Sequence, residues 1–181
     1  MNSTSFEVQM PPENWTLPNG TKVLLRNLQP TDLALHQQFL FACSSESLYQ
    51  RFFKAVNQKK LTERKVSQWT DYDRLRELAI AAIQHPNHDK ELGVVRLICI
   101  EPGVAEFALL VADAWQGQGL GRKLTEKAIA ICQANGIRCL RATVLNTNQT
   151  MLHLARRLGF TVLQVESGLC EISRQVHPIP T

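Results

Sequence analysis

Hydrophobic residues recur along the chain with two different periods, and the changes between them predict the order of the elements. Short apolar runs bounded by turn residues predict seven strands, at 21–28, 78–83, 93–100, 104–111, 139–145, 160–165 and 169–173. Apolar positions three or four residues apart predict helices after Pro30 and at 45–53, 61–70, 120–135 and 150–158. Strands outnumber helices, and crossover helices occur only in the second half. We therefore predict an α+β fold with a mixed, mostly antiparallel sheet of about seven strands flanked by helices.

Turn-forming residues define the limits of a single folded domain. Pro11, Pro12, Pro18 and the pair Asn19-Gly20 predict a poorly structured lead-in over residues 1–20. The domain then covers 21–176, and 177–181 form a tail. A chain of 181 residues in one domain is long enough to bury about 70% of its unfolded surface.

The composition excludes several classes of partner. The net charge of +4 is mild and its residues are dispersed, which does not favour nucleic-acid binding. No apolar run is long enough to span a membrane, and no signal peptide is evident. Five scattered cysteines without a Cys-x-x-Cys pair favour reduced thiols in the cytoplasm. The turn histidines His85 and His88 lack an acidic partner at metal spacing, so we predict no metal site; a monomer and a homodimer remain open.

Three glycines at alternate positions separate the strand that ends at Val111 from the helix predicted after it. Glycine permits positive φ and close approach of a ligand, and free N–H groups at a helix start attract phosphate. A phosphate or pyrophosphate site is therefore predicted over this loop, which comprises Gln116, Gly117, Gln118, Gly119, Leu120, Gly121, Arg122 and Lys123. A Walker A loop is excluded because Arg122 stands where its second glycine should be, and the spacing also differs from a Rossmann fingerprint. A tight turn without a ligand is the alternative.

Two spaced motifs link this loop to a known family. The pattern Gln-x-x-Gly-x-Gly, at 116, 119 and 121, resembles the coenzyme A pyrophosphate loop of the GCN5-related N-acetyltransferases, the GNAT family. Asn148, after the next strand, and Gly159-Phe160 keep the spacing of a second motif of that family. A narrower likeness, from about Leu24 to Val165, is to the catalytic domain of bacterial Pat-type protein lysine acetyltransferases; it is carried by 47–53, 71–74 and 105–108.

The resemblance implies a fold and a coenzyme site. In GNAT proteins the fourth and fifth strands splay apart, and the arm of acetyl-CoA enters the gap. The backbone of Leu109, Leu110 and Val111 would then contact the pantetheine, with the N–H of Leu110 or Val111 as the oxyanion donor. Asn148 would either reach the same arm or cap the helix that follows it.

Acetyl transfer to an amine needs a group that takes a proton, because a free lysine is mostly ammonium at neutral pH. Glu106 is the candidate general base, and a solvent-facing strand residue is the alternative. Tyr72, in the cluster 71–74, is a candidate wall or proton donor on the acceptor side; the alternative is a capped loop. Many GNAT proteins have a tyrosine acid at the position of Ala155, so the thiolate here leaves unassisted, or Tyr72 or water protonates it.

These patterns together predict a cytoplasmic N-acetyltransferase that uses acetyl-CoA as co-substrate. The favoured acceptor is a lysine side chain of a protein substrate. The alternatives are a small amine, such as a polyamine or an amino acid, and a catalytically silent module that binds or senses acetyl-CoA.

Overall fold

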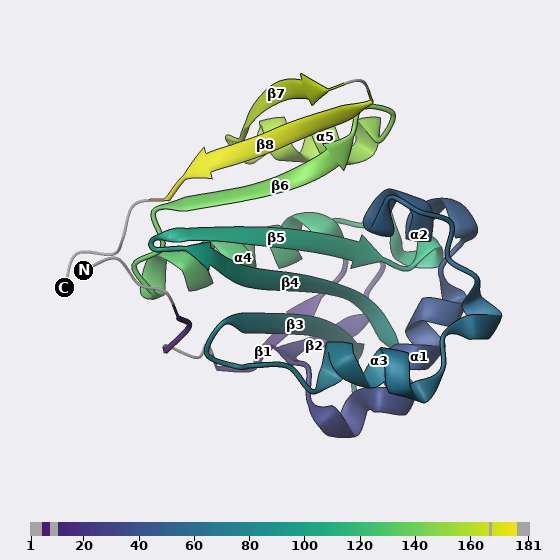
Figure 1. Ribbon diagram of the computed structural model, residues 1–181. Coiled ribbons are helices and arrows are strands. Elements are labelled where there is room, and N and C mark those ends of the chain that lie inside the picture. The colour runs from purple at the N-terminus through teal and green to yellow at the C-terminus, as the bar shows by residue number, and fades with distance from the viewer. Residues whose placement is uncertain (1–4, 8–10, 167, 177–181) are drawn as a thin grey trace.

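Eight strands form one sheet in the computed structural model, which describes residues 5–7, 11–166 and 168–176, in the order β1-β2-β3-β4-β5-β6-β8-β7 (Figure 1). The strands are β1 (Glu13–Thr16), β2 (Lys22–Asn27), β3 (Glu77–Gln84), β4 (Glu91–Glu101), β5 (Val104–Val111), β6 (Cys139–Leu145), β7 (Thr161–Glu166) and β8 (Leu169–Gln175). The α-helices are α1 (Leu33–Ala42), α2 (Ser45–Phe52), α3 (Glu63–Thr70), α4 (Leu120–Ala134) and α5 (Gln149–Arg157). Three 3-10 turns add η1 (Pro30–Asp32), η2 (Gln58–Lys60) and η3 (Asp113–Trp115).

The helices form two layers, one on each face of the sheet (Figure 1). Helices α4 and α5 pack on one face in a core that includes Ile80 and Phe107. Helices α1, α2 and α3 cover the other face of β3, β4 and β5, in a second core that includes Ala81 and Leu110. Because β3 is buried on both faces, its sequence is continuously apolar rather than alternating. The predicted α+β fold is confirmed.

The strands β5 and β6 are parallel neighbours for only three residue pairs. Val104, Ala105 and Glu106 pair with residues 139–141, and all other strand pairs in the described sheet are antiparallel. Beyond Glu106 the two strands separate, and β5 continues to Val111 without a partner on that side. The predicted splay between the fourth and fifth strands of the sequence is therefore present, as β5 and β6.

The eighth strand, β1, lies inside the lead-in that we predict to lack regular structure. Its four residues stand between Pro12 and Pro18, so the local pattern is too short to indicate a strand. Tertiary contacts hold it in place: Trp15 packs against the core on the α4 side, and Glu13 forms ion pairs with Lys123 and Lys127 of α4. Within the described ranges, no helix combines the length and the apolar composition needed to cross a bilayer.

Candidate active site

The loop between β5 and α4 presents backbone amides with no internal partner. Gly117 and Gly119 adopt φ values of 72° and 84°, in the left-handed region that glycine favours. Within the described part of the chain, the N–H groups of residues 117–122 donate to no acceptor. The N–H of Lys123 begins the helical ladder by donating to the Gly119 carbonyl, at 3.0 Å. The amides therefore lie free at the positive end of a fifteen-residue helix.

The side chains of this loop have other partners. Gln116 Nε2 donates to the Val111 carbonyl at 3.0 Å and to Ser47 Oγ at 3.1 Å, so it braces the loop against β5 and α2. Lys123 turns toward β1 and pairs with Glu13, and Leu120 is buried in the core. Gln118 donates to the Ala114 carbonyl. What this loop offers to a ligand is thus mainly backbone.

A cleft of about 670 Å³ opens where β5 and β6 separate. Of the predicted site residues, it brings together Glu106, Leu109, Leu110, Val111, Gln116, Gly117, Gly119, Gly121, Arg122 and Asn148. Gln118, Leu120, Lys123 and Tyr72 do not line it. The cleft thus joins the glycine-rich loop to the free edge of β5 and to Glu106 at the far end of that edge.

The backbone of β5 has a defined direction at the cleft. The N–H of Ala112 donates to the Leu92 carbonyl on the β4 side, at 3.0 Å. Because backbone groups alternate between the two sides of a strand, the N–H groups of Leu109 and Val111 face the gap. The Val111 carbonyl, which accepts from Gln116, lies on that same side.

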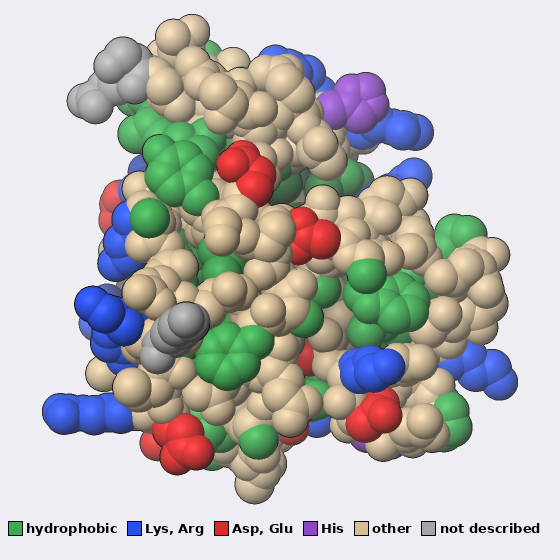
Figure 2. All heavy atoms as spheres, turned by 90° about the vertical axis from the view of Figure 1, so that its right-hand side faces the viewer, with side chains coloured by type: hydrophobic (Ala, Val, Ile, Leu, Met, Phe, Trp, Pro, Cys, Tyr) green, Lys and Arg blue, Asp and Glu red, His purple; other side chains and the backbone are tan. Residues whose placement is uncertain are grey.

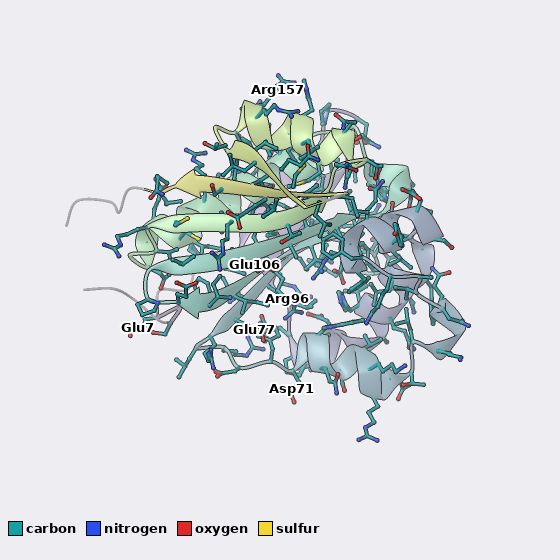
Figure 3. All side chains as sticks on the ribbon, turned by 45° about the horizontal axis from the view of Figure 1, so that its top comes forward. Glu7, Asp71, Glu77, Arg96, Glu106 and Arg157 are labelled. Atoms are coloured by element: carbon teal, nitrogen blue, oxygen red, sulfur yellow. The ribbon has the colours of Figure 1, made fainter. Side chains whose placement is uncertain are left out.

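Glu106 is exposed at the last position where β5 pairs with β6, and its side chain forms no hydrogen bond or ion pair with the described residues. Figure 3 shows Glu106, Arg96 and Glu77 on the neighbouring strands β5, β4 and β3. The guanidinium of Arg96 pairs with Glu77, at 3.0 Å, rather than with Glu106. The carboxylate of Glu106 is therefore free to meet a ligand.

Tyr72 lies outside the cleft, under the second core. Its hydroxyl accepts a hydrogen bond from the Ala79 N–H at 3.1 Å and donates to the Leu28 carbonyl at 3.4 Å. The guanidinium carbons of Arg74 and Arg96 lie 5.3 and 4.9 Å from its ring centroid. These contacts tie the loop before β3 to the sheet, and they place the hydroxyl away from the residues that line the cleft. Tyr72 thus braces this loop, and the cleft that brings the other candidates together does not include it.

Helix α5 forms the wall of the cleft opposite β5. Asn148 Oδ1 caps this helix by accepting from the Met151 N–H at 3.0 Å, which leaves the side-chain NH₂ free of described partners. Ala155, at the family's tyrosine position, is buried in the core. His153 and Arg157 line the cleft from α5. Figure 2 views the end of the molecule toward which β5 points, and basic side chains lie at the top and upper right of this view.

Helix α2 and the residues that cap its two ends supply cleft residues that we did not predict as site residues, namely Ser44, Glu46, Ser47, Gln50, Arg51 and Phe53. Asp113 positions the start of this helix by accepting from the Ser44 N–H and hydroxyl, both at 2.7 Å, and from the Ser47 hydroxyl at 2.9 Å. Burial acts to raise the pKa of Asp113, but these hydrogen bonds outweigh it and lower the pKa. The polar spacing 47, 50 and 51 on one helix face is the signal that could have revealed this wall.

Comparison with known proteins gives the family. The family model "Acetyltransferase (GNAT) domain" matches residues 22–161. The chain belongs to the GNAT acetyltransferase family. As a GNAT protein it is an acyltransferase, and in the described part of the chain no three His, Cys, Asp or Glu side chains come together as metal ligands would.

Individual GNAT relatives agree with this assignment. The chain is 30% identical to Acetyltransferase PA5475 of Pseudomonas aeruginosa over 152 residues, which cover 82% of this chain and 81% of that protein. Its structure is similar to the GNAT domain of S. lividans PAT, with a TM-score of 0.82 and 27% identity over 92% of this chain and 99% of that one. A cAMP-binding acyltransferase from Mycobacterium smegmatis shares the fold at a TM-score of 0.62 and 23% identity; the match covers 93% of this chain and 48% of that one.

Proposed function

We propose that this GNAT enzyme transfers the acetyl group of acetyl-CoA to a primary amine, with a protein lysine as the favoured acceptor. The observation that carries the proposal is the single cleft along the free edge of β5, which has unpaired amides at one end and the unpaired carboxylate of Glu106 at the other. An anionic coenzyme and a cationic amine fit these two ends.

The coenzyme half fits a diphosphate and a pantetheine arm. The amides of residues 117–122 would hold the diphosphate oxygens, as free N–H groups at a helix start do. The arm would follow β5, where the N–H groups of Leu109 and Val111 and the free NH₂ of Asn148 can donate to its amides. Because the N–H of Val111 faces the gap, we favour Val111 over Leu110 as the oxyanion donor.

The transfer follows from these positions. An ammonium acceptor loses a proton through water to Glu106, and the neutral nitrogen attacks the thioester carbonyl carbon. The oxyanion forms opposite the Val111 N–H; it then collapses, breaks the C–S bond and releases the coenzyme thiolate. The nitrogen loses its second proton to solvent, and the thiolate leaves unassisted or takes a proton from water, because neither Ala155 nor Tyr72 offers one in the cleft. The products are an amide, the free thiol of coenzyme A and one released proton.

The Pat-type likeness supports a protein lysine as acceptor. It appears both in the sequence segments around Arg51 and Glu106 and in the similarity to the S. lividans PAT domain. The cleft is lined by exposed residues such as Glu46 and Glu106, so a side chain on another protein surface can reach it. The five cysteines are free, which is consistent with our placement of the enzyme in the cytoplasm. A small amine acceptor and a silent coenzyme-binding module are the competing functions.

Thiol release, followed by mass spectrometry of the products, tests the function on a panel of lysine peptides and small amines. We expect Glu106→Gln to lower kcat by about 10²- to 10⁴-fold, with the acetyl-CoA Kd from calorimetry unchanged within about twofold. The control is Glu101→Gln, because Glu101 pairs with Arg141 outside the cleft. Unchanged turnover in Glu106→Gln would remove Glu106 from the mechanism, and coenzyme binding without thiol release on any amine would support the silent module.

A further inference from the structure

Arg51 lies at the acceptor end of the cleft with an unused guanidinium. It is half-buried on α2, and it lines both the main cleft and a smaller cavity of about 20 Å³ beside Ala108 and Leu110 of β5. Its guanidinium carbon lies 4.9 Å from the Phe52 ring centroid. Across the described ranges, the Arg51 side chain has no hydrogen bond and no ion pair.

Other arginines packed against the sheet are satisfied. Arg26 binds the Asp32 carboxylate with both terminal nitrogens, at 2.6 and 2.8 Å. Arg96 pairs with Glu77 at 3.0 Å and also donates to the Trp69 carbonyl. A half-buried cation without a hydrogen-bonding anion costs free energy, so the exception at Arg51 marks a position where the protein leaves room for an external partner.

The surroundings of Arg51 define the charge of that partner. Burial and repulsion by Arg96 lower the pKa of Arg51 to about 10, so the guanidinium still carries its charge at neutral pH. Glu106 attracts it but forms no ion pair with it within 4.0 Å. Among the described residues, the guanidinium of Arg51 and the carboxylate of Glu106 thus face the same cleft without neutralising each other.

We infer that Arg51 is a carboxylate-recognition site at the acceptor end of the cleft, selecting a substrate that carries a carboxylate near the reacting centre. A guanidinium binds a carboxylate through two parallel N–H···O bonds, which suits the planar group of Arg51. The inference rests on the proposed acyl transfer. Two substrates can carry the group: an amine acceptor, such as an amino acid or a lysine next to an acidic residue, or an acyl group with a terminal carboxylate, such as succinyl.

Paired substrates test this site. One arm compares two lysine peptides, with Glu or Gln beside the lysine, and free lysine with its carboxamide, all with acetyl-CoA. The other arm compares succinyl-CoA with butyryl-CoA, which is similar in length and lacks the carboxylate. In at least one arm, we expect the wild-type kcat/KM to be tenfold or more higher for the carboxylate form, because hydrogen bonds between two charged groups are stronger than those between neutral groups.

The variants assign the preference to Arg51. Arg51→Gln should bring the ratio of kcat/KM between the paired substrates close to one. Arg51→Lys should keep part of the preference for the carboxylate form, and Arg51→Glu should reverse that preference. The control is Arg64→Gln, an exposed residue of α3 that lines neither cavity. The ratio is measured within each variant, so a general loss of activity does not imitate the result, and thermal melting checks folding.

The failures of the two proposals are distinguishable. If no amine or acyl-CoA gives thiol release, the proposed function fails. If transfer occurs but the wild type shows no carboxylate preference in either arm, or Arg51→Gln keeps the wild-type ratio, the carboxylate site is overturned while the acyltransferase stands.

Discussion

The two halves of the cleft are built from different materials. The half that we propose for the coenzyme is backbone: free amides of residues 117–122 and the open edge of β5. The proposed acceptor half is made of side chains: Glu106 of β5 and residues of α2, whose start is held by Asp113 and whose Arg51 lies beside His36 and Leu40 of α1. A backbone site depends mainly on where the glycines and the helix start lie. A side-chain site depends on which distant segments meet. Substitutions in it can therefore change the substrate that the protein accepts while the fold stays the same.

The buried pair of His36 and Glu91, next to the proposed acceptor half, gives the largest expected effect, on the free energy of unfolding. His36 Nδ1 of α1 lies 2.9 Å from Glu91 Oε2 of β4, and both side chains are buried. Burial raises the pKa of Glu91, and the nearby His36 opposes this. We expect Glu91→Ala to lower the free energy of unfolding by about 3 kcal/mol, because one buried polar partner is removed, as measured by urea denaturation. Glu91→Gln, which can still accept from His36, is the control and should lose less; an equal loss would mean that packing, not the pair, holds α1.

The second largest effect is expected when a larger side chain at Gly121 fills the proposed coenzyme half of the cleft. A Cβ on Gly121 would lie 3.4 Å from Leu109 Cδ2 and 3.7 Å from Leu154 Cδ2, between β5 and α5. Alanine fits there, whereas the longer side chain of Gly121→Leu would occupy the cleft. We expect Gly121→Leu to raise the acetyl-CoA Kd by about 100-fold, equivalent to about 2.7 kcal/mol, with a much smaller change in Gly121→Ala. Calorimetry measures both, and near-normal affinity in Gly121→Leu would show that the coenzyme does not pass this gap.

The hydrogen bonds that join Asp113 to the start of α2 give a smaller effect, on protein stability, which depends on pH. The pKa of Asp113 is lowered, so its stabilisation is complete above its usual value of 3.8 and is lost as the pH falls through the lowered value. At pH 7 we expect Asp113→Asn to be less stable by about 1 kcal/mol, through weakened bonds to Ser44 and Ser47. The difference from wild type should shrink on acidification, as measured by urea midpoints from pH 7 to pH 3. A difference that stays constant would contradict the assignment.

Substitution of two adjacent cations, Arg122 and Lys123, should give the smallest difference in acetyl-CoA affinity. Arg122 lines the cleft and pairs with Glu126 of the same helix at 2.8 Å, whereas Lys123 lies outside the cleft and is paired with Glu13 of β1. We expect Arg122→Gln to raise the acetyl-CoA Kd about fivefold, since an exposed charge contributes about 1 kcal/mol or less. Lys123→Gln should change the Kd less than twofold. Calorimetry at low and moderate salt separates the two variants, and the reverse order would mean that Lys123 leaves Glu13 when the coenzyme binds.

Local sequence patterns determine much of the half of the cleft that we propose for the coenzyme. The alternate glycines before α4, the residues that cap α5 and the apolar run of β5 all act through local backbone geometry, which neighbouring residues determine. For this reason the loop amides and the cap at Asn148 could be predicted without coordinates, whereas the splay of the two strands was expected only from the resemblance to GNAT proteins. Seven of the strands follow from local hydrophobic patterns for the same reason.

The acceptor half and the role of several side chains depend on packing between segments that are far apart in the sequence. Strand β1 forms because β2 and α4 are there to pair with it. Tyr72 turns to the backbone of β3, and Arg51 of α2 lies within the electrostatic reach of Glu106 of β5, more than fifty residues away in sequence. Such contacts join segments that are far apart in the chain, and the local sequence of one segment does not indicate its contact with the other. A chain's local pattern therefore determines where backbone is free, and its packing determines which side chains meet there.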